Sequence, residues 1–303
     1  MNFFGRRLTV MSLFAIALFA VSATFGSFAY VGAQDRLRHL DNLLSGAVDL
    51  NGERSGQPSV SGIVFATGIA TPEKPLLEEA FNLQIPALKL MRESEIFQWV
   101  PWGKTYVEEW HHEPKQALWS SERHRNTGTI AYPTRIQTAD PIILKGKTAF
   151  KLDPAFAEFI GGDRKHFLSE ADYERMPTEV RSRFQLVEGS LVENSAAMGD
   201  PKIGDNRTRF RVVAPYEVTV VGYLEGGSVR TTDASGIPVG ILLPGRKSLD
   251  EMREQISSNI IGDAMPHGVL SFLLWIGALS MLRKDFRNAP KVERPVEPLR
   301  LGR

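Results

Sequence analysis

The side chains most able to carry chemistry in this sequence lie between positions 108 and 124. They are His111, His112, His124, Glu108, Glu109 and Glu113, types that can hold a zinc ion or move protons. Their spacing argues against this use, because there is no H-E-x-x-H motif and no pair of histidines four residues apart. Adjacent histidines on a strand also point to opposite faces, so only one of His111 and His112 could join a given site. We expect no metal and no cofactor here, and a membrane-tethered hydrolase using the 108–124 region stays as an alternative.

Other catalytic signatures are missing from the sequence. It contains no cysteine, which excludes cysteine nucleophiles, zinc ribbons and iron–sulfur clusters. It has no nucleophile elbow of the G-x-S-x-G type, no phosphate-binding loop and no dinucleotide-binding motif. The net charge of +1 gives no reason to expect a nucleic-acid partner. The sequence therefore favours a protein that is not an enzyme.

The chain that carries these side chains has a long apolar run near its N-terminus. Residues 8–34 contain 27 positions without a charge, and a helix needs about 20 apolar residues to cross a bilayer. We predict a transmembrane helix over 8–31. The alternative is a signal peptide cleaved after the small residues Val31-Gly32-Ala33, which would release an exported binding module. The apolar run is longer than the usual signal core of about 7–15 residues, which favours the anchor.

A second uncharged run of 19 residues covers 264–282 and ends at Arg283-Lys284. Its large apolar residues lie on all helical faces, which predicts a transmembrane helix rather than a buried core helix. Pro266 and Gly268 fall at its start, where missing backbone hydrogen bonds are least costly.

Basic residues predict the orientation of the chain in the membrane. The tail 283–303 carries seven Lys or Arg against three acids, and the N-terminus 1–7 carries Arg6 and Arg7 with no acid. The rest of the chain then holds 27 basic and 32 acidic residues, a net charge of −5. By the positive-inside rule both termini are cytosolic. The domain 35–262 would then lie in a periplasm or a lumen.

The pattern of residues 35–262 predicts an α+β domain rich in antiparallel strands. An amphipathic helix is expected just after the first span, with leucines at helical spacing from Leu37 to Leu44. Strands are expected over 87–99, over 105–113, within 133–147, and on both sides of turns at Glu188-Gly189 and Gly226-Gly227. Helices are expected over 153–160, over 169–184 with Ser169 as cap and Pro177 as an interruption, and from Ser248 into the second span. Gly62 and Gly68 in the strand "SVSGIVFATGIAT" indicate close approach of a neighbouring backbone.

The tryptophan-rich region is the candidate structural or interaction surface. Trp99, Trp102, Trp110 and Trp119 are expected to pack a β core or its membrane-proximal edge. Lys89, Arg92 and Glu95 are expected to align partly exposed charges across neighbouring strands. Under this interpretation Trp99→Ala should unfold the domain, and Arg92→Glu should disturb mainly self-association.

Several motifs in this region resemble the transmembrane protein 43 family, also called LUMA. They are Leu88-Lys89-Leu90, Glu95-Ile96-Phe97-Gln98-Trp99, Glu109-Trp110 and His124-Arg125-Asn126, followed by "PKIGDNRTRFRV", "VTVVGYLEGGSV" and "LLPGRKSLDEM". They occur in the family's order and cover about Ser61 to Met252. The sequence departs from the family in two respects: the family usually has several spans after the loop, whereas one fits here, and Thr127 replaces a turn proline.

The resemblance implies a membrane protein with a large lumenal or periplasmic domain and no known catalytic residues. The animal member organises nuclear-envelope and endoplasmic-reticulum proteins with emerin and lamins, and nothing in this sequence extends those partners to it. We expect a scaffold for membrane or envelope assemblies that contacts the lipid bilayer and either itself or other membrane proteins. The candidate residues are Lys89, Arg92, Glu95, Trp99, Trp110, His124 and Asn126.

Overall fold

The computed structural model describes residues 2–3, 6–7, 10–51, 61–115, 124–146, 148–197 and 199–288. The chain divides into two units, one formed by residues 1–45 and 249–303 and the other by residues 46–248. Trp119 and residues 289–303 of the predicted basic tail lie outside the described residues.

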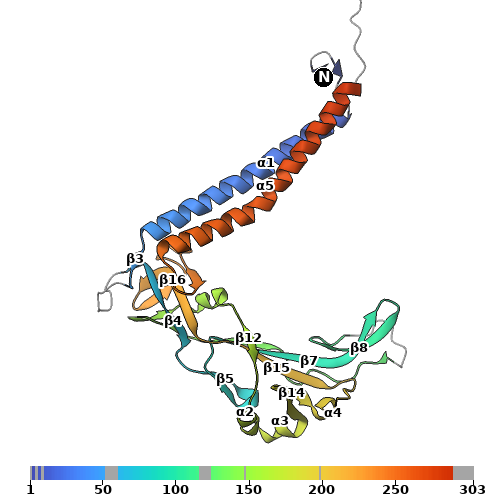
Figure 1. The fold of residues 1–303 in the computed structure, drawn as a ribbon, viewed down its shortest axis with the longest axis vertical. Coiled ribbons are helices and arrows are strands. Elements are labelled where there is room, and N and C mark those ends of the chain that lie inside the picture. Colours follow the sequence, from blue (N-terminus) through green and yellow to red (C-terminus); the bar gives the residue numbers. More distant parts are fainter. Residues whose placement is uncertain are drawn as a thin grey trace, which may run out of the picture. The chain divides into compact units, whose positions relative to one another are not determined.

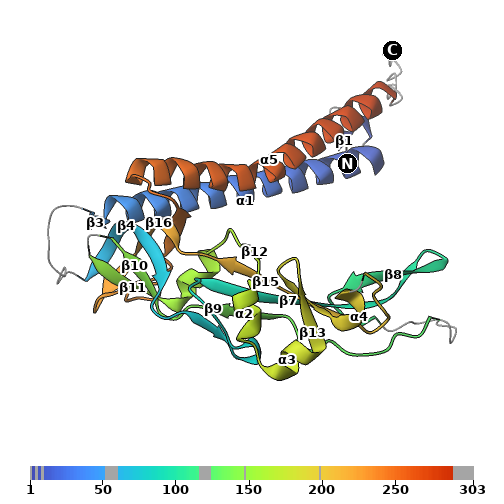
Figure 2. The ribbon, with the colours of Figure 1, turned by 60° about the horizontal axis from the view of Figure 1, so that its bottom comes forward.

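The first unit is a pair of long helices, α1 (Val10–Ser45) and α5 (Leu249–Asn288), that run side by side (Figures 1 and 2). A short pair of strands, β1 (Asn2–Phe3) and β2 (Arg6–Arg7), precedes α1. The predicted amphipathic helix is the last part of α1, with no break after the apolar run. The helix predicted from Ser248 likewise continues into the second apolar run.

Both helices expose large apolar side chains along most of their length. They include Phe14, Phe19, Phe28, Leu270, Phe272 and Leu273, each at least 40% exposed. Each helix contains an apolar window long enough to cross a membrane, and only 12% and 6% of those windows are buried. A core helix of a soluble domain would be mostly buried, so this exposure favours lipid as the surroundings of both helices.

Polar contacts join the two helices at two levels. The Ser271 hydroxyl donates a 2.7 Å hydrogen bond to the Ser22 carbonyl, and Arg253 pairs with Asp41 at 3.0 Å. Pro266 lies in the interior of α5 rather than at the start of a helix, because the helix already begins at Leu249. α5 bends midway along its length (Figure 2), as expected where proline removes a backbone hydrogen bond.

The second unit contains a closed barrel of five strands. Its ring consists of β4 (Gly62–Pro72), β10 (Ile142–Lys145), β11 (Ala149–Leu152), β17 (Ser228–Arg230) and β16 (Tyr216–Glu225), and β16 pairs back with β4. Counted in chain order, β11 and β17 are the third and fifth of these strands, and they pair in parallel. This is the strand order of the five-stranded Greek-key barrels of the OB type. β3 (Val48–Asp49) and β18 (Ile241–Pro244) extend the barrel sheet.

Glycines allow the barrel strands to come close together. A Cβ atom on Gly68 would lie 2.6 Å from the Lys145 carbonyl oxygen, and one on Gly222 would lie 2.7 Å from the Arg230 carbonyl oxygen. The expected close approach is therefore confirmed at Gly68. Among the described residues, no atom lies within 4 Å of the Cβ position at Gly62, so the expectation is not met there. The barrel core contains Val64, Leu144, Val220 and Phe156.

A second sheet is built on the long strand β7 (Lys89–Trp102). The strands follow one another across the sheet in the order β13 (Phe184–Val187), β14 (Ser190–Glu193), β15 (Asn206–Val213), β7 and β8 (Thr105–His111). Two further strands pair beside this path: β12 (Arg164–His166) with β15, and β9 (Arg135–Thr138) with β7. The predicted turns are confirmed: Glu188, Gly189, Gly226 and Gly227 all have positive φ. The chain passes from this sheet to the barrel at Ala214-Pro215, between β15 and β16.

Short elements cover one face of the second sheet. They are the hairpin of β5 (Leu76–Glu78) and β6 (Leu83–Ile85), the 3-10 helix η1 (Glu79–Phe81), and the helices α2 (Glu170–Glu174) and α3 (Thr178–Arg183). Ser169 caps α2 through a capping box with Asp172, and Pro177 separates α2 from α3 as predicted. The segment 153–160 is the 3-10 helix η3 (Pro154–Phe159) rather than an α-helix, and α4 (Asn194–Ala197) follows β14.

Candidate functional site

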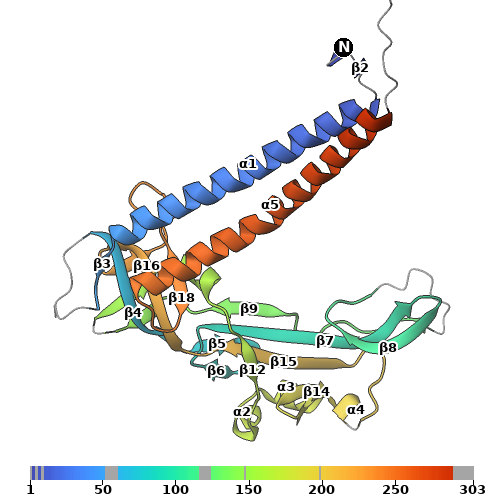
Figure 3. The same ribbon diagram turned by 45° about the horizontal axis from the view of Figure 1, so that its top comes forward.

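The tryptophan-rich region forms a two-stranded extension of the second sheet, which we call the arm (residues 97–111). Strand β15 pairs with β7 only as far as Ile96. Beyond that point β7 is paired with β8 up to Trp102 and Thr105, and the two strands project from the sheet (Figures 1 and 3). Gly103, with φ of 60°, allows the tight turn at the tip.

Aromatic side chains gather on one face of the arm. The register places Phe97, Trp99, Tyr106 and Trp110 on the same face. Phe97 and Trp110 have ring centroids 5.4 Å apart. His124 stacks on Tyr106 at 4.6 Å and meets the edge of Trp99 at 4.8 Å.

The described tryptophans are not part of a hydrophobic core. Neither core cluster contains Trp99, Trp102 or Trp110, and Trp102 at the tip is 71% exposed. The expectation that they pack a β core is therefore wrong for these three tryptophans, and the alternative that they pack its membrane-proximal edge stays a prediction. The core positions are instead taken by phenylalanines such as Phe81, Phe184 and Phe210, because β7 extends past the sheet before its tryptophans begin.

Asn126 holds the base of the arm in place. Its side chain accepts a 2.7 Å hydrogen bond from the Trp99 amide and donates to the carbonyls of Trp99 and Lys115 at 3.0 and 2.9 Å. Gln98 also binds the backbone of this segment, donating to the Glu113 carbonyl at 2.6 Å and accepting from the Lys115 amide at 2.8 Å. Asn126 was among the candidate residues predicted from the sequence, whereas Gln98 was not.

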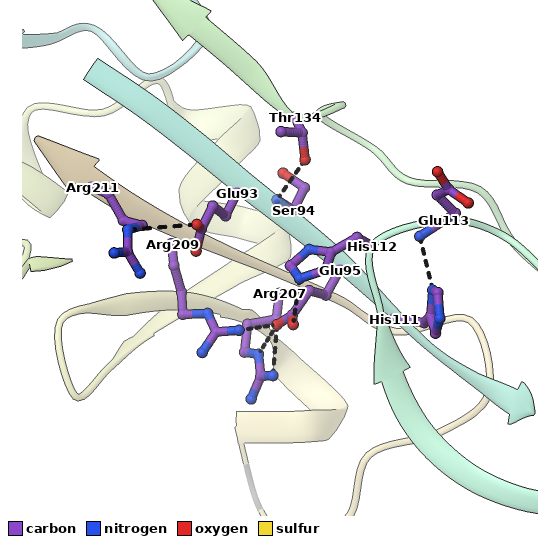
Figure 4. A network of polar contacts seen from close by, with 10 residues as sticks. All are labelled: Glu93, Ser94, Glu95, His111, His112, Glu113, Thr134, Arg207, Arg209 and Arg211. Carbon is purple, nitrogen blue, oxygen red and sulfur yellow. Dashed lines mark hydrogen bonds and ion pairs between the residues drawn. The ribbon is translucent and has the colours of Figure 1, made fainter. Parts of the chain in front are cut away.

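Glu95 is the centre of a charge network (Figure 4). Its carboxylate pairs with Arg207 at 2.6 Å and with Arg209, and lies 3.7 Å from His112 Nε2. Glu95 is only 5% exposed, so the expectation of a partly exposed charge is wrong for it. Arg207 also lies over the Trp110 ring at 4.5 Å, which joins the network to the aromatic face.

A separate group of ion pairs lies further along β15 at Arg211. Arg211 pairs with Asp163 and, at 3.7 Å, with Glu93. The hydrogen bond from Arg211 lowers the pKa of the exposed Asp163 carboxyl below its usual value. Every second residue of β15 from Arg207 to Arg211 is therefore an arginine facing an acid. The matching E-x-E of β7 and R-x-R-x-R of β15 were a signal in the sequence that could have indicated this pairing.

Arg92 is buried, which contradicts the expectation that it is a partly exposed cross-strand charge. It is 7% exposed and its Nη1 donates a 2.6 Å hydrogen bond to the buried carboxylate of Glu78. Its other nitrogens donate to the Pro133 carbonyl. Desolvation lowers the pKa of Arg92 and the charge of Glu78 opposes this. Arg92 therefore stabilises the fold from inside, whereas Lys89 is half-buried and donates to the Ile160 carbonyl at 3.3 Å.

The histidines and glutamates of the arm are spread over separate contacts. His112 faces Glu95, His111 accepts a hydrogen bond from the Glu113 amide, and His124 stacks among the aromatic rings (Figure 4 shows the first two). Within the described residues no three His, Asp or Glu side chains come together as a metal site would require. The arrangement brings aromatic and charged side chains together on one face of the arm.

Comparisons with known proteins give one family. The model described as Transmembrane protein 43 matches residues 103–285. A Transmembrane protein 43 homolog of Drosophila melanogaster is 25% identical over 215 residues, which cover 63% of this chain and 54% of the fly protein. The chain thus spans about half the length of that relative. No solved structure gives a significant match.

A second match is short. A phosphoribosylaminoimidazole-succinocarboxamide synthase of Rhodopirellula baltica is 39% identical over 75 residues, which cover 23% of this chain and 23% of the synthase.

Proposed function

The chain belongs to the transmembrane protein 43 family, and from this premise we propose that it organises assemblies of membrane proteins without catalysing a reaction. The arm of its extracytoplasmic domain would make the contacts. Two helices with exposed apolar surfaces, together with the family, make it an integral membrane protein.

The orientation in the membrane is part of this proposal. The basic residues of both termini support cytosolic ends, and the net acidic middle supports a domain on the other side, in a periplasm or a lumen. The helix α1 runs without interruption from Val10 to Ser45, through the small residues Val31 to Ala33. The apolar run from 8 to 34 is longer than the usual core of a signal peptide, about 7–15 residues, which favours an uncleaved anchor over the exported module.

The observation that carries the proposal is the exposed tip of the arm. Trp102 has 71% of its surface exposed and follows Pro101 on a strand that extends beyond the sheet. Tryptophan is among the residues most enriched in the energetically dominant positions of protein interfaces. Lys104 and Thr105 beside it are also exposed, so the tip presents an apolar ring with a polar rim, as interfaces do.

The hydrolase alternative gains no support from the described residues. His111, His112 and His124 face different partners, as given above, and no shared site lies between them. The synthase match covers under a quarter of either protein, which is too little to carry an activity to this chain.

Photocrosslinking from the tip of the arm tests the proposal. A photoreactive phenylalanine analogue replaces Trp102 in the full chain, and two differently tagged copies are expressed together in the same membrane. The matched control places the analogue at Phe167, which is 66% exposed and lies outside the arm. We expect position 102 to give discrete crosslinked species, either between the two copies or to another membrane protein, and position 167 to give none. Equal labelling from both positions, or none from position 102, would contradict the proposal.

A further inference from the structure

A cleft lies in the second unit where the chain passes from the second sheet to the barrel. Its volume is about 500 Å³, within the range of about 300–1,000 Å³ that is usual for small-molecule sites. Its wall is mostly apolar, and the residues that form this part are Phe159, Val213, Ala214, Pro215, Tyr216 and Pro244. Phe159 is 49% exposed, so a large apolar side chain is left in contact with solvent.

Among the described residues that line this cleft, Arg164 is the only one with a charge. It is exposed and makes no ion pair with the residues that the structure describes. The nearest acid in sequence, Asp163, is already paired with Arg211. Lys89 adds a second positive charge nearby, since its Nζ donates to the carbonyl of Ile160, next to the lining residue Gly161. One end of the cleft is therefore positively charged and the rest is apolar.

We propose that this cleft binds a single-chain fatty acid, with the carboxylate at Arg164 and the hydrocarbon chain against Phe159, Pro215 and Pro244. An apolar wall with one uncompensated cation is complementary to a ligand with an apolar body and one negative charge. Guanidinium groups bind carboxylates through paired hydrogen bonds. This site is separate from the arm and is independent of the proposed role in assembly.

A photoreactive fatty acid tests the proposal on the full chain. The protein is reconstituted into nanodiscs of zwitterionic phospholipid, incubated with a diazirine-bearing palmitate, irradiated and digested for mass spectrometry. The variant is Arg164→Gln. The matched control is Lys165→Gln, which removes a charge from the next residue of β12, where the side chain points to the other face of the strand. A diazirine-bearing fatty alcohol of the same length serves as the uncharged probe.

We expect the fatty acid to label peptides that contain Phe159 or Pro215, and unlabelled palmitate to compete. Arg164→Gln should lower this labelling about tenfold, the loss expected when one charge-assisted contact disappears, while Lys165→Gln should leave it unchanged. The fatty alcohol should label the unchanged protein about as weakly as the fatty acid labels the Arg164→Gln variant. Labelling confined to α1 and α5, equal labelling by acid and alcohol, or displacement by phospholipid instead of palmitate would overturn the proposal.

Discussion

At the scale of single residues, the buried pair of Arg92 and Glu78 shows how a charge can stabilise the fold. Both are under 10% exposed, and Glu78 also accepts a 3.0 Å hydrogen bond from Gln137. A buried carboxylate that loses its partner keeps the full cost of its desolvation. The pair is therefore far more sensitive to change than the exposed ion pairs of the same domain.

Arg92→Leu should destabilise the domain by about 3–5 kcal/mol, because it leaves Glu78 charged and buried. Arg230→Leu is the matched control, since Arg230 and its partner Glu225 are each about half exposed, and it should change stability by about 0–1 kcal/mol. Thermal unfolding of the full chain in detergent, followed by tryptophan fluorescence, measures both. Similar melting temperatures for the two variants would show that the pair is not buried as described.

Replacing Phe210 should destabilise the domain more than replacing Trp99, although the sequence predicted that Trp99→Ala would unfold it. Phe210 is 1% exposed and lies in a core cluster, so Phe210→Ala should cost about 3–5 kcal/mol. Trp99 is only half-buried and lies against His124 on the arm, so Trp99→Ala should cost clearly less, about 1 kcal/mol. The resistance of the domain to a protease, compared for the two variants, distinguishes them. If the Trp99→Ala protein is degraded as fast as the Phe210→Ala protein, Trp99 contributes to the core and this prediction is wrong.

At the scale of elements, the barrel depends on glycines where strands approach closely. Gly68→Ala should destabilise the domain by about 1–3 kcal/mol, because the new methyl group would meet the backbone of Lys145 on β10 and could not be accommodated by a rotamer change. Gly161→Ala is the control, since no atom lies within 4 Å of its Cβ position, and it should be neutral or slightly stabilising. Thermal melting again measures both, and a neutral Gly68→Ala would argue against the pairing of β4 with β10.

Elements with a local signal could be predicted from the sequence. The cap at Ser169, the interruption at Pro177 and the turns at Glu188-Gly189 and Gly226-Gly227 each depend on a few neighbouring residues, and all are present. Local patterns do not give pairing between distant strands, so the closure of the barrel by β16 and β4 was not predicted.

The side-chain environments of the candidate site were predicted less well, for the same reason. Alternating charges on β7 look exposed in isolation. Arg92 is buried because the β5–β6 hairpin brings Glu78 over it, and Glu95 is buried by arginines more than 100 positions later in the chain. Trp99 looked like a core residue because its sequence does not reveal that β15 stops pairing at Ile96.

At the scale of the whole molecule, the central proposal is that the two helices cross a membrane with the domain on the non-cytosolic side. The helices expose apolar surface in a way that only lipid or another protein would cover. The basic tail predicts which side is cytosolic. If the orientation were reversed, the arm would meet cytosolic partners and the proposed role within the envelope or lumen would fail.

Cysteine accessibility tests this orientation most directly, since the chain has no cysteine of its own. Single cysteines replace Lys104 at the tip of the arm and, separately, Arg300 in the tail, and sealed vesicles with the non-cytosolic face of the membrane outward are treated with a membrane-impermeant maleimide. The expected result is labelling of Lys104→Cys from the non-cytosolic side, and labelling of Arg300→Cys only after the membrane is permeabilised. Labelling of Arg300→Cys in sealed membranes, with Lys104→Cys protected, would contradict the account.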